Sequence, residues 1–217
     1  MKPRPLRKRI IIAQNATLYI INGGKFMGLA IPPKIRTEDY GVMSALEIDK
    51  NQCKDIINLH KDSRNIHKTG KVQSNKSNVV NLKKRDVDVY VLHEDFSWVD
   101  SLLCTAALTA NLTYNFDIVG LLERPQLLRY KSPSEGYGWH LDIGTGDQST
   151  RKISISLALN DGYQGGQLSF FMTGSHSLDI PLGTAVAFPS FFPHRVEPVT
   201  EGERWSLVCW ITGQPFR

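Results

Sequence analysis

The sequence has few cysteines and no long apolar run. Cys53, Cys104 and Cys209 lie far apart and form no Cys-x-x-Cys pair. This argues against a disulfide framework and against a zinc ribbon, and it is typical of a reducing compartment. No stretch reaches the ~18 apolar residues of a membrane-spanning helix, and the apolar run after the basic start is too short for a secretory signal. We therefore expect a cytoplasmic protein with no membrane partner.

Charge is unevenly distributed between the two halves of the chain. Residues 1–90 hold 18 Lys and Arg against 8 Asp and Glu, a net +10, whereas residues 91–217 hold 8 against 13, a net −5. A basic half can attract an acidic partner such as nucleic acid. The plainer alternative is a solvated surface, and the sequence favours it because no interleaved aromatic residues indicate a nucleic-acid platform.

The composition is otherwise that of a globular protein, with 41% hydrophobic and 22% charged residues in a chain of 217, which fits one main domain. We expect an N-terminal extension with short strands over residues 1–45 and a main domain over residues 46–217. Within that domain the helical support spans residues 49–117, with one helix opening at Asp49 and another capped by Asp95.

The second half of the chain has the pattern of a β-protein. Residues 61–78 are polar and predict a long loop, either a lid or disordered. A jelly-roll core is then expected over about residues 124–211, because short strands alternate there with Gly, Pro and Asp turns. The expected strands are 124–130, 138–142, 152–159, 167–171, 183–188, 194–199 and 204–211.

A metal site is indicated at His140-Leu141-Asp142. Residues two apart on a strand point to the same face, so both side chains can reach one cation. His194, from a distant strand, would complete a set of two histidines and one carboxylate. Such a set leaves coordination positions open and is typical of non-haem Fe(II) oxygenases. For either histidine taken alone a structural role is favoured, but for the full set it is not.

The His-x-Asp pattern occurs three times, so the motif alone selects nothing. His60-Lys61-Asp62 closes a predicted helix, where residues two apart diverge by roughly 200°. In His93-Glu94-Asp95 the aspartate is expected to cap a helix. His67 and His176 are expected at the surface. Strand context therefore favours the copy at residue 140.

From about residue 124 to residue 210 the chain resembles the prolyl-4-hydroxylase-like branch of the 2-oxoglutarate/Fe(II) dioxygenases, including small bacterial and phage members. The matching segments cover about the last two-fifths of the chain and keep the order and spacing of that family. They are Leu127-Leu128-Arg129-Tyr130, Gly136-Tyr137-Gly138-Trp139-His140-Leu141-Asp142, Arg151, Ser154, Leu159-Asn160, Gly165-Gly166-Gln167-Leu168, Gly183-Thr184-Ala185-Val186-Ala187-Phe188-Pro189, His194-Arg195-Val196, Pro198-Val199-Thr200-Glu201-Gly202-Glu203-Arg204 and Trp210.

The resemblance implies a mainly β fold with supporting helices, namely the double-stranded β-helix, a cupin-like jelly roll. It implies that His140, Asp142 and His194 bind iron. It also implies that Arg204 pairs with the distal carboxylate of 2-oxoglutarate, for which a planar guanidinium is suited. In isolation, Arg204 would equally fit a surface ion pair.

Further cosubstrate contacts are expected from Tyr130 and Ser156. Tyr130 corresponds to a tyrosine that supports the cosubstrate in the family, although an ordinary core aromatic fits the sequence as well. Ser154, Ser156 and Ala158 share one face of a predicted strand, and we expect this small face to border the cosubstrate cavity. Some family members have a tyrosine where Ala158 stands, and many have a glutamate in the place of Gln167.

The implied activity is hydroxylation of a C–H bond with Fe(II), 2-oxoglutarate and O2, releasing succinate and CO2, and with L-ascorbate as a further reductant. No separate protein nucleophile is expected. The closest branch suggests a prolyl residue of a peptide or protein as substrate, with Trp139 and Arg195 as candidate substrate contacts. The alternatives are a free amino acid, another small molecule or a nucleobase. Nucleobase oxygenases usually carry a second arginine at the position of Trp210. The tryptophan therefore makes a nucleobase the less favoured substrate.

An alternative of another class is a non-catalytic jelly-roll module that binds metal. The absence of a metal ligand or of the arginine would indicate such a module, and the sequence contains all of these residues. The oligomeric state is not predicted.

Overall fold

The computed structural model describes residues 12–13, 16–17, 41–69, 87–171 and 174–216. The chain divides into two units, Met1–Glu38 and Asp39–Arg217. In the first unit the strands β1 (Ile12–Ala13) and β2 (Ala16–Thr17) pair antiparallel. The rest of the first unit, and residues 70–78 of the polar loop expected at 61–78, lie outside the described residues.

The second unit is built on a large antiparallel sheet, in which the order β3-β13-β9-β16-β7-β5-β4 is completed by β6 beside β16. Its strands are β3 (Met43–Glu47), β4 (Ile66–Thr69), β5 (Asp88–Val91), β6 (Ile118–Gly120), β7 (Gln126–Lys131), β9 (Arg151–Ala158), β13 (Thr184–Pro189) and β16 (Glu203–Gly213).

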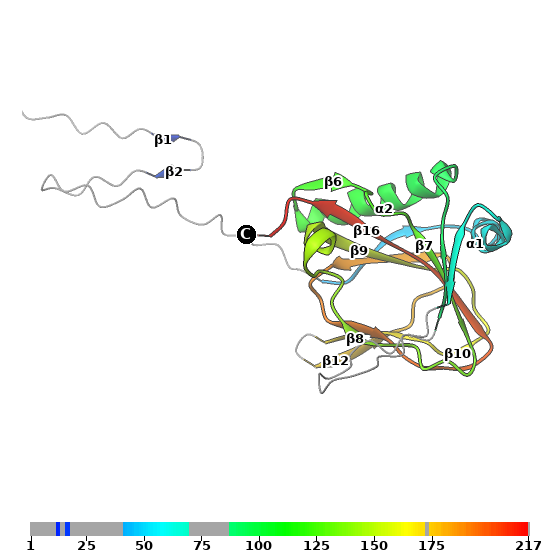
Figure 1. Ribbon diagram of the computed structural model, residues 1–217. Helices are drawn as coiled ribbons and strands as arrows, with labels where there is room; N and C mark the ends of the chain where they lie inside the picture. Colours follow the sequence, from blue (N-terminus) through cyan, green and yellow to red (C-terminus); the bar gives the residue numbers. More distant parts are fainter. Residues whose placement is uncertain (1–11, 14–15, 18–40, 70–86, 172–173, 217) are drawn as a thin grey trace, which may run out of the picture. The chain divides into compact units, whose positions relative to one another are not determined.

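A smaller antiparallel sheet faces the large one. Its order is β12 (Ser175–Leu178), β11 (Leu168–Phe171), β14 (His194–Val196) and β8 (Tyr137–His140). A further pair joins β10 (Gln164–Gly165) to β15 (Val199–Glu201). Figure 1 shows the two layers, with β8 and β12 on one side and β7, β9 and β16 on the other. This arrangement confirms the predicted jelly roll.

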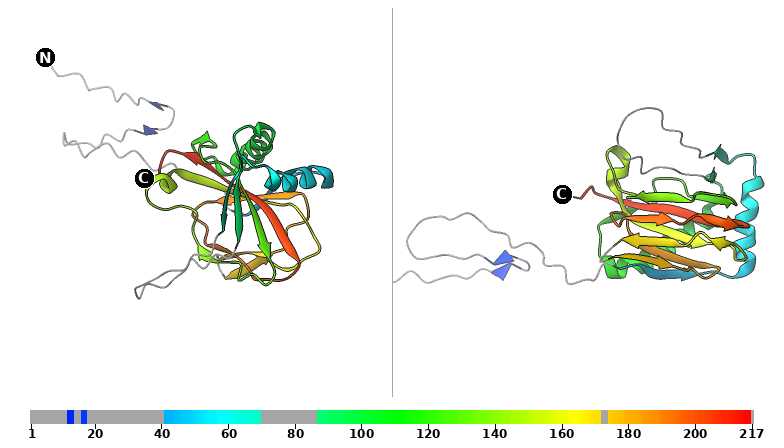
Figure 2. Two further views of the ribbon diagram at one scale, coloured as in Figure 1. Left: turned by 45° about the vertical axis from the view of Figure 1, so that its right-hand side comes forward. Right: turned by 90° about the horizontal axis from the view of Figure 1, so that it is seen from below.

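Two helices cover the outside of the large sheet, namely α1 (Lys50–Asn58), continued by the 3-10 turn η1 (Leu59–Lys61), and α2 (Ser97–Tyr114). Figure 2 shows α1 running across one end of the strands. The expected opening of α1 at Asp49 is confirmed: its carboxylate accepts from the backbone of Asn51 and Gln52, and the Gln52 side chain accepts from the Asp49 backbone.

The expected cap of α2 is wrong. The residue at the N-cap position is Phe96, which makes no side-chain cap bond, whereas the Asp95 carboxylate lies 2.5 Å from Nη1 of Arg64. Asp95 is therefore engaged in an ion pair with a distant segment instead of satisfying the first N–H groups of the helix.

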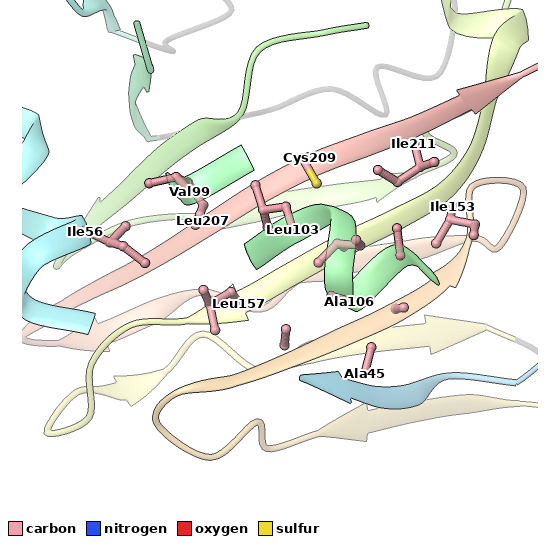
Figure 3. Close-up of a cluster of buried hydrophobic side chains, with 14 of the residues drawn as sticks. Ala45, Ile56, Val99, Leu103, Ala106, Ile153, Leu157, Leu207, Cys209 and Ile211 are labelled. Atoms are coloured by element: carbon pink, nitrogen blue, oxygen red, sulfur yellow. The ribbon is translucent and has the colours of Figure 1, made fainter. Parts of the chain in front are cut away.

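The two faces of β9 explain how the layers stack. Ile153, Ile155 and Leu157 belong to the core cluster shared with α1 and α2, shown in Figure 3. A second cluster fills the space between the two sheets and includes Tyr130 and Phe188. Because successive side chains of a strand point to opposite faces, the serines of β9 lie on the side of the smaller sheet.

Several boundaries differ from those expected. β3 begins before residue 46 and already pairs with β13, while the division into an extension and a domain remains a prediction. β4 lies within the segment expected to be a loop, and the strand expected at 194–199 is divided into β14 and β15. Pro198 stands between these two strands, and a proline cannot donate a backbone hydrogen bond.

Candidate metal and cosubstrate site

Three possible metal ligands meet between the sheets. His140 ends β8 and His194 begins β14, and the two residues are paired across these strands. The Nε2 atom of each histidine lies 3.5 Å from an oxygen of the Asp142 carboxylate, and one ligand atom from each residue lies within 4.8 Å of the others. Neighbouring ligands of a metal bound at ~2.1 Å lie roughly 3 Å apart. The donor set therefore fits a single cation.

Both histidines are oriented by backbone carbonyls. The Nδ1 atom of His140 lies 2.8 Å from the oxygen of Gly138, and that of His194 lies 2.9 Å from the oxygen of Phe192. When Nδ1 carries the proton and donates it to a carbonyl, the Nε2 lone pair is left free for a metal. In both residues this lone pair faces Asp142.

Ser154 holds the carboxylate of Asp142, and Ser190 supports Ser154 and the Asp142 backbone. The Ser154 hydroxyl donates to Oδ2 at 2.6 Å and lies 3.0 Å from the Ser190 hydroxyl. The backbone N–H of Asp142 donates to the Ser190 carbonyl at 3.1 Å. Asp142 and its two serine partners are all buried, so the orientation of the carboxylate is fixed before any ligand binds.

The protonation states suit metal binding. Burial alone would raise the pKa of Asp142, but its interactions with the neighbouring His140 and His194 hold that pKa well below its usual range. Burial lowers the pKa of His194, although the neighbouring Asp142 opposes this shift. A carboxylate and a neutral imidazole are the forms that coordinate metals.

The ligands border a cavity of about 240 Å³ that also contains Arg204. Arg204 is only 3% exposed. Its Nη1 donates to the Ser206 hydroxyl at 2.9 Å, and its buried Nε has no hydrogen-bond partner. No carboxylate of the described residues forms an ion pair with it. A buried unpaired charge is costly, so this guanidinium fits an acidic ligand such as the distal carboxylate of 2-oxoglutarate.

Tyr130 and Ser156 both line this cavity, as expected. The guanidinium carbon of Arg204 lies 5.4 Å from the centre of the Tyr130 ring. The Ser156 hydroxyl makes no hydrogen bond to another described residue. Gly166 leaves room for the arginine, because a Cβ there would lie 2.7 Å from Cδ of Arg204.

Trp139 and Arg195 do not line the cavity. Each is the strand neighbour of a candidate ligand and therefore points to the opposite face of the smaller sheet. The guanidinium of Arg195 lies 4.9 Å from the centre of the Trp139 ring and pairs with Glu197 at 2.7 Å. Their role in substrate binding stays a prediction that the cavity does not support.

The remaining histidines lie elsewhere. His60 and His67 both contact the Tyr90 ring, outside the cavity. His93 lies 3.4 Å from a carboxylate oxygen of Asp95. His176 is exposed, as expected, but it belongs to a strand, β12, and not to a loop. Within the described residues, the cluster at residue 140 is the one group of histidine and acidic side chains placed to hold a metal ion.

Sequence reasoning missed several residues around the cavity. Gln126 lies on β7 two residues before Leu128 and four before Tyr130, and all three line the cavity. The two-residue period of the strand could have found it. Gln148 also lines the cavity, but it lies in a 3-10 turn, Gly146–Thr150, where the two-residue period does not apply, and Arg151 lines it as the first residue of β9. Ser190 reaches Asp142 from the turn that follows β13.

Residues 125–212 match the family model of the 2OG-Fe(II) oxygenase superfamily. A PKHD-type hydroxylase of Synechococcus sp. (strain CC9902) is 35% identical over 88 residues, 39% of this chain and 40% of the relative. One of Thermosynechococcus vestitus is 32% identical over 120 residues, 52% of this chain and 54% of the relative. The chain thus spans about half the length of these curated relatives.

A solved prolyl hydroxylase from Trichoplax adhaerens, in complex with a hypoxia inducible factor oxygen degradation domain peptide, superposes with a TM-score of 0.61. It is 19% identical and covers 82% of this chain and 85% of its own. At this identity the likeness concerns the fold.

Fold and site together define a class: a jelly roll with two histidines and an aspartate at one end of its cavity and a buried arginine in its wall. The family match makes this more specific. Residues 125–212 match the model of the 2OG-Fe(II) oxygenase superfamily, and the fold is similar to that of a solved prolyl hydroxylase.

Proposed function

We propose that this protein is an Fe(II)- and 2-oxoglutarate-dependent dioxygenase that hydroxylates a prolyl residue of a peptide or protein. One observation carries the proposal. The same cavity holds three converging metal ligands and the buried Arg204, which has no acidic partner among the described residues. A metal-binding module without catalysis would have no need of such an arginine, because burying its charge without a counterion costs stability.

The prolyl substrate is supported by the relatives. The aligned curated proteins are named PKHD-type hydroxylases, and a structural neighbour is a prolyl hydroxylase bound to a peptide. Two polar residues of the cavity lining, Gln126 and Gln148, offer hydrogen bonds of the kind that a peptide backbone can complete.

Each side chain has a defined task in this proposal. His140, Asp142 and His194 would hold the metal through Nε2 and carboxylate atoms, and Arg204 would bind the distal carboxylate of 2-oxoglutarate with two parallel hydrogen bonds. Ser156 and Tyr130 would border the bound cosubstrate. Bound Fe(II) would supply the activation of O2, which is the oxidant: one oxygen atom would enter the C–H bond and the other would enter succinate as 2-oxoglutarate loses CO2.

The walls of the cavity have a task as well. Leu128, Phe188 and Val208 line it with apolar surface. Such walls exclude water, which strengthens the ion pair of Arg204 with its ligand and protects the reaction from side reactions.

The test is hydroxylation of proline-containing peptides in the presence of Fe(II), 2-oxoglutarate and O2. We expect succinate to form and the peptide to gain one oxygen atom by mass spectrometry. Asp142→Ala should abolish both, because two histidines alone hold the metal weakly. The metal-free melting temperature of this variant serves as the control for folding. Equal turnover by wild type and Asp142→Ala would contradict the proposal.

A further inference from the structure

Arg151 connects three segments of the chain next to the metal ligands. It is the first residue of β9, it is 7% exposed, and it lines the cavity. Its Nε donates to Glu123 at 2.6 Å, and its Nη2 donates to the second oxygen of the same carboxylate. This two-point ion pair fixes the plane of the guanidinium.

The remaining donor of this guanidinium reaches the backbone of a metal ligand. Nη1 of Arg151 donates to the carbonyl oxygen of Asp142 at 3.1 Å. Asp142 lies beyond the end of β8, so no strand pairing holds its backbone. Its N–H is bound by Ser190 and its carbonyl by Arg151. The position of the ligand therefore depends on these two contacts.

The face of the same guanidinium is stacked on Trp210. The guanidinium carbon lies 3.8 Å from the ring centre, which is within the range of a cation–π contact. Trp210 belongs to β16 opposite Ser154 and lines the cavity. The Arg151 side chain thus contacts both the backbone of the metal ligand Asp142 and Trp210, which forms part of the cavity wall.

We propose that Arg151 is a positioning residue that holds Asp142 and Trp210 in register, and so sets the affinity of the site for metal. The inference rests on the proposed function, because it takes Asp142 as a ligand. A lysine could not replace Arg151 fully, since an ammonium cannot bind a carboxylate at two points, donate to the carbonyl and stack on the indole in one geometry.

The chain contains a matched control for this arrangement. Arg129 donates to both oxygens of Glu203, at 3.1 and 2.5 Å, and its guanidinium carbon lies 5.4 Å from the centre of the Trp205 ring. The arginine, glutamate and tryptophan are the same three residue types, but this set does not line the cavity and makes no contact with a metal ligand. Loss of Arg129 removes similar surface interactions without touching Asp142.

The experiment titrates Mn(II) into the metal-free protein by calorimetry, with no turnover involved. Wild type should bind one ion, and Arg151→Gln should bind it roughly 10–100-fold more weakly, the usual effect of losing a partner that orients a ligand. Arg151→Lys should lie between them. Arg129→Gln should bind Mn(II) like wild type.

A second pair of variants guards against misfolding. Glu123→Gln keeps Arg151 but weakens its anchor, so we expect a smaller loss of Mn(II) affinity in the same direction, whereas Glu203→Gln should cause none. Melting temperatures of the metal-free proteins show that all variants are folded.

The outcomes separate the two claims. Equal Mn(II) affinity of wild type, Arg151→Gln and Glu123→Gln would overturn the positioning role while leaving the proposed function intact. A similar loss in the Arg129 and Glu203 variants would also overturn it, because the effect would then be one of general stability. Failure of wild type to bind Mn(II) would overturn the proposed function and this inference with it.

Discussion

At the scale of single residues, the site is defined by which polar atoms already have a hydrogen-bond partner and which do not. The Nδ1 atoms of His140 and His194 are bound to carbonyls, which leaves Nε2 for a metal. Asp142 is oriented by Ser154, and Arg204 keeps a buried nitrogen without a partner. These atoms indicate a cationic ligand at one end of the cavity and an anionic one in its wall.

Arg204→Gln should weaken 2-oxoglutarate binding. Removing one partner of a buried charged pair costs about 2 kcal/mol or more, which corresponds to at least roughly 30-fold in the dissociation constant. Calorimetry with Mn(II)-loaded protein measures it. Arg195→Gln, which removes an arginine from the outer face of the smaller sheet, should bind 2-oxoglutarate as wild type does. Equal affinity for the cosubstrate in both variants would refute the role of Arg204.

The stability of the metal-free protein should depend on pH through His194. Its pKa in the folded protein is lowered by burial. Below pH ~6.5, therefore, His194 binds a proton in the unfolded chain but not in the native state. The free energy of unfolding should therefore decrease as the pH falls from 7.5 to about 5.5. Urea unfolding at several pH values measures this slope, which should be shallower in His194→Gln. An unchanged slope in that variant would contradict the assignment.

At the scale of elements, the sequence predicted the helices and strands whose two faces differ in polarity. β9 alternates isoleucine and leucine with small residues, and the prediction of one core face and one cavity face holds. β4 was missed because Ile66-His67-Lys68-Thr69 has little apolar character and is held by backbone pairing with β5. The cap of α2 was wrong because Arg64, a distant residue, competes for Asp95. Local signals cannot include such partners.

Asp49→Ala should destabilise the protein by about 1 kcal/mol, the usual cost of losing a helix N-cap. The Asp49 carboxylate accepts from the backbone of Asn51 at 2.7 Å and of Gln52 at 3.0 Å. Urea denaturation measures the change in unfolding free energy. Asp55→Ala, an exposed aspartate within the same helix, is the control and should change the stability by less than about 0.5 kcal/mol.

At the scale of the whole molecule, the two sheets bring together residues that are far apart in sequence. The three ligands and Arg204 were predicted from sequence because motif order and spacing follow the family, and the structure brings them to one cavity. Trp139 and Arg195 were not placed there, since neighbours of inward-facing residues on a strand point outward. Arg151 matched the family pattern, but its contact with Asp142 and that of Ser190 were not predictable from the sequence. No helix of the described residues is long and apolar enough to cross a membrane.

The central claim is that one cavity binds a metal through His140, Asp142 and His194 and a dicarboxylate through Arg204. Anomalous diffraction from crystals of the protein with Mn(II) and 2-oxoglutarate tests it most directly. The account predicts a metal peak at ~2.0–2.2 Å from Nε2 of both histidines and from an Asp142 oxygen, with the distal carboxylate of 2-oxoglutarate hydrogen-bonded to Arg204. A metal bound elsewhere, or a 2-oxoglutarate that does not contact Arg204, would contradict it.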